Sequence, residues 1–106
     1  MSRASGPAAI ERSADGGVRI TGALGFANAG ALLPQGIAFT SRGRTTDVDL
    51  SGLTDADSAT LALLLAWSAR ATQIGGRLRY RGAPVGLRAL ARLAEVEPLL
   101  GLSEQA

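Results

Sequence analysis

The residues best suited to chemistry lie in one short run, "DADSAT" at residues 55–60, which directly precedes a leucine-rich segment. Asp57 or Ser58 is well placed to cap a helix, because its side-chain oxygen can accept hydrogen bonds from the free N–H groups of the first turn. Alternatively, an exposed Ser58 is a phosphorylation or docking position, since a helix N-terminus favours added negative charge. The neighbouring Asp49, Asp55 and Asp57 would oppose that charge. Both interpretations can hold together, because a capping end can also face a partner.

The amino-acid composition argues against an enzyme. The 106 residues include no cysteine, which excludes thiolate chemistry, and no histidine, which removes the commonest general base and the commonest metal ligand. No group of residues has the spacing of a metal site, and no glycine-rich run completes a phosphate-loop pattern. We therefore predict a protein with no catalytic residue, no metal site and no cofactor.

The charge balance gives little support for nucleic-acid binding. Eleven arginines face nine carboxylates, and the net charge of +2 is spread along the chain, whereas nucleic-acid binders usually carry a concentrated basic stripe. The segment "RLRYR" at 77–81 invites a phosphate-binding interpretation. Three arginines at a spacing of two are, however, more typical of the exposed face of a sheet. We predict no direct contact with nucleic acid.

The hydropathy pattern is that of a soluble protein. No segment reaches the roughly 18 consecutive apolar residues of a membrane span, and the N-terminal residues lack the continuous apolar stretch of a signal peptide. An apolar content of 46% with 19% charged residues fits one globular domain. We expect a cytoplasmic location, with any membrane link made through a partner.

Alternating and helical patterns predict an α/β domain with helices packed against one sheet. The turn residues Asp15-Gly16-Gly17 indicate a hairpin between its first two strands. Pro34 and Gly36 indicate a short or broken helix after the hairpin, and Gly75-Gly76 should end the strongest helix. The expected elements are strands at 8–13 and 18–24, a broken helix at 28–38, a strand at 45–51, a loop at 51–57, a helix at 58–74, a strand at 77–81 and a helix at 82–98.

The helix at 58–74 carries two apolar stripes, although one stripe is enough to cover a sheet. The first comprises Leu61, Leu64, Leu65, Ser68 and Thr72. The second comprises Thr60, Leu63, Trp67 and Ile74, with Ala59 and Arg70 beside it. Either the second stripe is buried under another helix or a loop, or it forms an exposed partner-binding surface anchored by Trp67. On the second view, Trp67→Ala weakens partner binding while the domain stays folded.

Two long segments carry a family resemblance. The segments "VDLSGLTDADSATLALLLAWSARA" (48–71) and "GGRLRYRGAPVGLRALARLAEVEPLL" (75–100) resemble STAS domains, and among them the MlaB-like proteins. The resemblance implies a STAS-like α/β fold, a single domain whose mixed sheet has helices packed chiefly on one face. It places this domain at residues 8–102, after a flexible N-terminal segment at 1–7.

The resemblance also implies a function. MlaB-like proteins are non-enzymatic accessory subunits of the Mla phospholipid-transport ABC system, which maintains the lipid asymmetry of the outer membrane. For this chain it implies binding to an MlaF-like ATPase subunit in a complex with a membrane permease, at the cytoplasmic side of the inner membrane. The alternative within the STAS family is an anti-sigma factor antagonist that is regulated by phosphorylation of a serine, here Ser58.

The helix pattern and the resemblance together define the predicted site. The predicted partner-binding residues are Asp57, Ser58, Thr60, Leu63, Trp67, Arg70 and Ile74. Ser58 is also the candidate switch residue, because it stands where STAS proteins place a switch or contact hydroxyl. Thr60 stands where many STAS proteins have glycine, since "DSAT" replaces the commoner "DSSG". The added bulk at the helix start argues against a phosphorylation switch.

Overall fold

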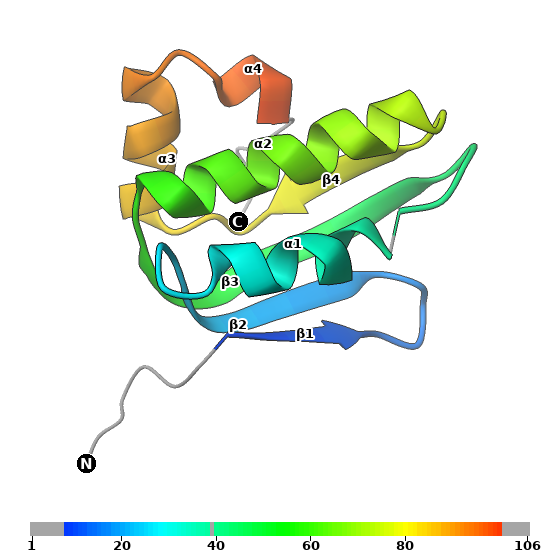
Figure 1. Cartoon of the computed structure of the whole chain (residues 1–106), viewed down its shortest axis with the longest axis horizontal. Helices are drawn as coiled ribbons and strands as arrows, with labels where there is room; N and C mark the ends of the chain where they lie inside the picture. The colour runs from blue at the N-terminus through cyan, green and yellow to red at the C-terminus, as the bar shows by residue number, and fades with distance from the viewer. Residues whose placement is uncertain (1–7, 39, 101–106) are drawn as a thin grey trace.

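Four strands form one mixed sheet in the order β1-β2-β3-β4 (Figure 1). β1 (Ala9–Arg12) pairs antiparallel with β2 (Val18–Leu24), and β2, β3 (Thr45–Ala56) and β4 (Arg77–Arg81) run parallel to one another. This computed structural model describes residues 8–38 and 40–100. The predicted α/β fold with a mixed sheet is confirmed. The expected flexible segment at 1–7 and the domain end at 102 lie outside the described residues.

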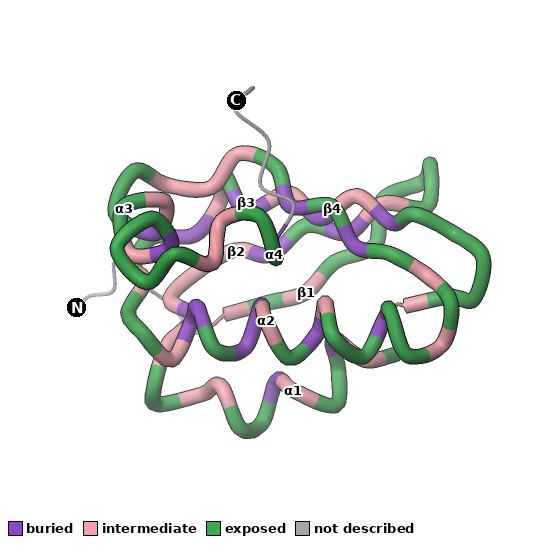
Figure 2. Tube along the Cα trace, turned by 90° about the horizontal axis from the view of Figure 1, so that it is seen from above, coloured by how far each residue is buried: buried purple, intermediate pink, exposed green. Residues whose placement is uncertain are grey.

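Two helices cover one face of the sheet. α1 (Ala29–Ile37) connects β2 to β3 and α2 (Ser58–Gln73) connects β3 to β4, and both lie on the same side (Figures 1 and 2). The short helices α3 (Val85–Leu93) and α4 (Glu97–Leu100) contact α2, and α4 also contacts β4. None of the helices in the described part of the chain has the length and apolar character needed to cross a membrane.

The opposite face of the sheet is charged and exposed. Along β4, Leu78 and Tyr80 are buried, while its three arginines point to the uncovered face. Arg79 Nε lies 2.7 Å from Asp47 Oδ1 on β3, and Arg81 Nη1 lies 3.7 Å from Asp47 Oδ2. The interpretation of "RLRYR" as the exposed face of a sheet is therefore confirmed.

β3 is longer than predicted, because it continues through residues 51–56, where we expected a loop. Its pairing with β2 steps from Arg19↔Asp49 to Thr21↔Gly52, so β3 contains one extra residue at this point. An extra residue reverses which side chains face the helices. Val48 and Leu50 are buried before Gly52 and Leu53 after it, and a second extra residue follows between Leu53 and Asp55. The sequence of β3 therefore does not alternate regularly.

The helix predicted at 82–98 is divided in two. α3 ends after Leu93, where Val96 N–H donates to Ala91 O (2.9 Å) and Glu95 N–H donates to Arg92 O (3.0 Å). These are the two hydrogen bonds of a Schellman motif, with Glu95 in the left-handed region at φ 60°. The chain then turns into α4. The end of α2 was predicted correctly: Gly75, at φ 83°, occupies the equivalent position.

Candidate functional site

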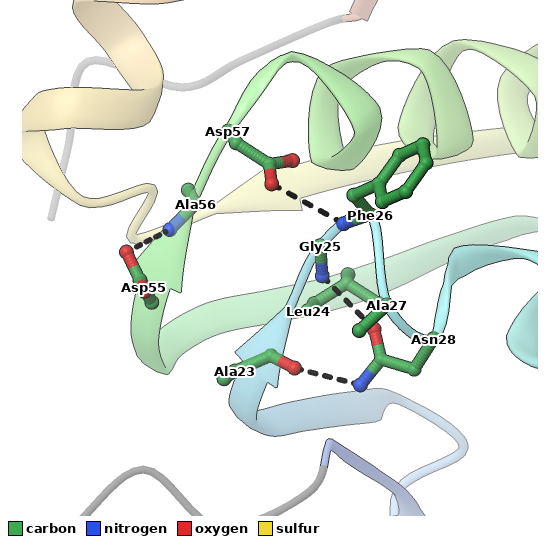
Figure 3. A pocket seen from close by; sticks show the side chains of 9 residues that line it. All are labelled: Ala23, Leu24, Gly25, Phe26, Ala27, Asn28, Asp55, Ala56 and Asp57. Atoms are coloured by element: carbon green, nitrogen blue, oxygen red, sulfur yellow. Dashed lines mark hydrogen bonds between the residues drawn. The ribbon is translucent and has the colours of Figure 1, made fainter.

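The start of α2 lies beside the loop that follows β2. β2 and β3 are parallel and end in register, with Leu24 opposite Ala56. Since the carboxyl ends of parallel strands meet at one edge of a sheet, this register brings the loop at 25–28 next to Asp57 (Figure 3). Ser58 follows Asp57 directly in the chain. The predicted acid–hydroxyl pair is therefore placed beside a loop that is 29 to 33 positions away in the sequence.

Asp57 caps α2 and also holds the neighbouring loop. Its Oδ1 accepts hydrogen bonds from the N–H groups of Ala59 (2.9 Å) and Thr60 (3.1 Å), and its Oδ2 accepts from Phe26 N–H (3.2 Å; Figure 3). Thr60 Oγ1 accepts from Asp57 N–H (3.0 Å), which completes a capping box. The choice between Asp57 and Ser58 as cap is thus settled in favour of Asp57. The three N–H donors, Phe26 foremost, hold the pKa of the Asp57 carboxyl below its usual range.

Thr60 is a structural residue and not a contact residue. Its side chain is fully buried, and its hydroxyl also hydrogen-bonds to the main-chain carbonyl of Leu24. One hydroxyl therefore ties the first turn of α2 to the end of β2. The prediction that Thr60 binds a partner is wrong, because no part of this side chain reaches the surface.

Trp67 and Leu63 are core residues, which corrects the predicted docking surface. Trp67 has 0% of its surface exposed and Leu63 has 4%. α1 lies over this side of α2, and Trp67 Nε1 donates a hydrogen bond to Leu33 O (2.9 Å). The second apolar stripe is therefore buried under another helix, as one of the two alternatives held. The expectation of an exposed surface anchored by Trp67 is wrong.

Arg70 and Ile74 lie far from the start of α2. Arg70 is exposed in the last turn of α2, and Ile74 is the half-buried C-cap. At a rise of about 1.5 Å per residue, Arg70 lies about 20 Å along the helix from Asp57. The structure thus does not gather the seven predicted residues into one site. Of those at the start of α2, Asp57 and Ser58 are exposed, and within the described residues the Ser58 hydroxyl has no hydrogen-bond partner.

A pocket of about 330 Å³ lies between the β2–α1 loop and the end of β3. Asn28 shapes the loop, because its Oδ1 accepts from Gly25 N–H (2.9 Å) and its Nδ2 donates to Ala23 O (2.7 Å; Figure 3). Phe26 stands at this pocket with 86% of its surface exposed. The lining residues are Ala23, Leu24, Gly25, Phe26, Ala27, Asn28, Asp55, Ala56 and Asp57.

A second, smaller pocket of about 220 Å³ adjoins the first. Asp55 and Ala56 line both, and the start of α3 forms the other side of the second pocket through Pro84 and Gly86. Between these two residues, Val85 is 85% exposed. The end of the domain thus exposes two apolar side chains, Phe26 and Val85, near two pockets that share Asp55 and Ala56.

Neither Phe26 nor Val85 was predicted from the sequence as part of the site. Each follows a strand of the parallel part of the sheet, and that position was the available signal, because loops at the carboxyl ends of parallel strands converge. The sequence does not reveal that either side chain is uncovered. We define the α2-start surface as Phe26, Asp55, Asp57, Ser58 and Val85.

The chemistry available at the α2-start surface is that of binding. It offers carboxylate acceptors, the exposed hydroxyl of Ser58 and apolar side chains. Within residues 8–38 and 40–100, no three histidine, cysteine, aspartate or glutamate side chains gather in a way that could hold a metal ion. The site therefore suits contact with another molecule.

The comparison with known proteins agrees with this fold. The chain matches none of the curated proteins. Residues 9–101 match the family described as "Mlab, STAS domain". STAS domain proteins are generally non-catalytic regulators. Because the match extends over most of the sequence, this chain belongs to the family of MlaB-like STAS domain proteins.

Proposed function

We propose that this chain is a non-enzymatic accessory subunit of an ABC-type phospholipid transporter and binds the cytoplasmic ATPase subunit of that transporter. The observation that carries the proposal is the exposed Phe26 beside the capped start of α2, in a domain of the MlaB-like STAS family. Large apolar side chains at the centre of an exposed surface are typical anchors of protein interfaces.

The proposed mechanism is stabilisation of the ATPase subunits in a productive arrangement. The start of α2 is fixed to the neighbouring elements before any partner arrives, since Asp57 bonds to the main chain of Phe26 and Thr60 bonds to the end of β2. A preorganised surface loses little conformational entropy on binding. Through this complex the chain would lie at the cytoplasmic side of the inner membrane and support outer-membrane lipid asymmetry without touching lipid itself.

Affinity purification of the tagged full-length chain from its native cells tests this function. We expect an ABC ATPase and a membrane permease to be recovered together, and we expect the purified chain to raise the ATPase activity or the stability of the purified ATPase subunit. Recovery of an anti-sigma kinase in place of the transporter subunits would contradict the proposal.

Ser58 favours a second candidate function, that of an anti-sigma factor antagonist. Its hydroxyl is exposed at the N-terminus of α2, where a kinase can reach it and where the helix favours negative charge. Asp55 and Asp57 nevertheless lie close by and oppose a phosphate. Trp67 does not help to distinguish the two functions, because it is buried. Intact-mass measurement of the chain from native cells decides: a Ser58-dependent gain of one phosphate supports the antagonist.

A further inference from the structure

We propose that the α2-start surface selects a positively charged side chain flanked by apolar residues on the ATPase subunit. This inference rests on the proposed function and specifies the chemistry of the contact. It concerns the sign of the charge that the surface accepts, which is opposite to the sign that a helix N-terminus alone would favour.

Among the described residues, no arginine pairs with the carboxylates of this surface. Asp55 Oδ1 accepts only from the N–H of the following Ala56 (3.0 Å), and among the described residues neither Asp55 nor Asp57 forms an ion pair. The contrast is with Asp47, which two arginines of β4 share on the open face of the sheet. The surface thus carries two exposed negative charges that a partner can neutralise.

The N-terminus of α2 is already occupied by an anion. The Asp57 carboxylate accepts from the N–H groups of Ala59 and Thr60 and from the N–H of Phe26 in the adjacent loop. An incoming phosphate or carboxylate would find the N–H groups of Ala59 and Thr60 already bonded and would meet two carboxylates, those of Asp57 and Asp55. The exposed Ser58 hydroxyl is a neutral donor and does not offset two negative charges. The electrostatics therefore favour an incoming cation, which Asp55 is free to bind.

The apolar side chains determine what must surround that cation. Phe26 is 86% exposed and Val85 is 85% exposed, and the pocket that Phe26 lines and the one beside Val85 share the wall formed by Asp55 and Ala56. An exposed ion pair by itself adds little affinity, because water screens it. Apolar contacts on both sides exclude that water and supply the hydrophobic part of the interface. The matching partner segment carries an arginine or lysine between apolar residues.

Calorimetric titration of the full-length chain with the purified ATPase subunit, repeated over a range of salt concentrations, tests this inference. Asp55→Asn should weaken binding by about fivefold at low salt and flatten the salt dependence, because a solvent-accessible charge pair is lost. Phe26→Ala should weaken binding by about tenfold and leave the salt dependence unchanged. Asp55→Lys should weaken binding further than Asp55→Asn. Two matched controls, Glu11→Gln on β1 and Leu93→Ala on α3, should bind like the wild type; both residues are exposed and lie outside the surface.

The possible outcomes separate this inference from the proposed function. Stronger binding of Asp55→Asn would show that the partner is anionic and would overturn the inference. The inference would also be overturned if the Asp55 and Phe26 variants bound as tightly as the controls Glu11→Gln and Leu93→Ala. The proposed function would still stand in that case, because the wild type binds the ATPase subunit. Failure of the wild type to bind the ATPase subunit would overturn both. Phe26 and Asp55 are exposed, so thermal unfolding by circular dichroism should show these variants folded like the wild type.

Discussion

Gly36 in α1 lies directly against the indole ring of Trp67 in α2. A Cβ atom on Gly36 would come within 1.8 Å of Trp67 Cε2. The same ring donates its Nε1–H to Leu33 O on α1. The two helices are thus joined by a close backbone approach and by a hydrogen bond, and the approach is possible only because residue 36 has no side chain.

Gly36→Ala should destabilise the domain. The added methyl group has no space beside the ring and forces α1 away from α2, at a cost of about 1–3 kcal/mol as for other overpacked cores. Gly30→Ala in the same helix is the matched control, because a Cβ there meets nothing within 4 Å. Alanine favours a helix over glycine by up to about 1 kcal/mol. Urea unfolding should therefore place Gly30→Ala at or above the wild type; equal stability of the two variants would contradict the packing of α1 on Trp67.

Trp67→Ala should unfold or strongly destabilise the isolated domain, which reverses the expectation drawn from the sequence. Removing a fully buried aromatic side chain costs about 3–5 kcal/mol, and Leu33 O would lose its donor. Trp67→Phe should cost less, because it keeps most of the apolar volume. Chemical unfolding followed by circular dichroism measures both. A Trp67→Ala variant with wild-type stability and impaired partner binding would restore Trp67 as an interface residue.

α2 and the sheet could be predicted from local sequence patterns, whereas the packing of α1 over Trp67 could not. The cap at Asp57, the glycine at the end of α2 and the alternation of Leu78 and Tyr80 with arginines are all signals within a few residues. The two apolar stripes on α2 indicate only that both sides are covered, either within the domain or by a partner. Gly36 reads in the sequence as a helix breaker, but its effect depends on the distance between two helices.

Only part of the candidate site could be predicted from the sequence, because only its capping residues leave a local pattern. Asp57 and Ser58 were recognised because capping is local chemistry. Phe26 belongs to the surface only through the parallel register of β2 and β3, and the irregularity in that pairing hid the length of β3. The exposure of Phe26 and Val85 depends on how the rest of the domain packs around them, and a local sequence pattern does not indicate this.

Thr60→Val tests whether the hydroxyl at position 60 joins α2 to β2. Valine keeps the shape of threonine, so the variant removes the bond that the hydroxyl accepts from Asp57 N–H and its bonds to Leu24 O and Asp57 Oδ1. Buried groups left without a partner cost about 1–3 kcal/mol. Thr60→Ser retains the hydroxyl and is the matched control for the loss of chemistry. Thermal unfolding should rank the wild type first, serine next and valine last; a valine variant above serine would contradict the bonding role.

The Asp57 carboxylate should make the stability of the domain depend on pH in the acid range. Its pKa is lowered from the ordinary value of 3.8 by hydrogen bonds from Phe26, Thr60 and Ala59. Because the folded state holds the proton less tightly than the unfolded chain, the stabilisation is fully present above pH 3.8 and is lost as the pH falls through the lowered pKa.

Asp15, Asp47 and Asp49 have lowered pKa values too, so the comparison with Asp57→Asn isolates the contribution of Asp57. Urea unfolding from neutral pH down to strongly acid pH should show the wild type more stable than Asp57→Asn at neutral pH, with a difference that shrinks below pH 3.8 as the wild-type carboxylate takes up its proton. A difference that stays constant through the acid range would mean that Asp57 acts through shape alone and not through its charge.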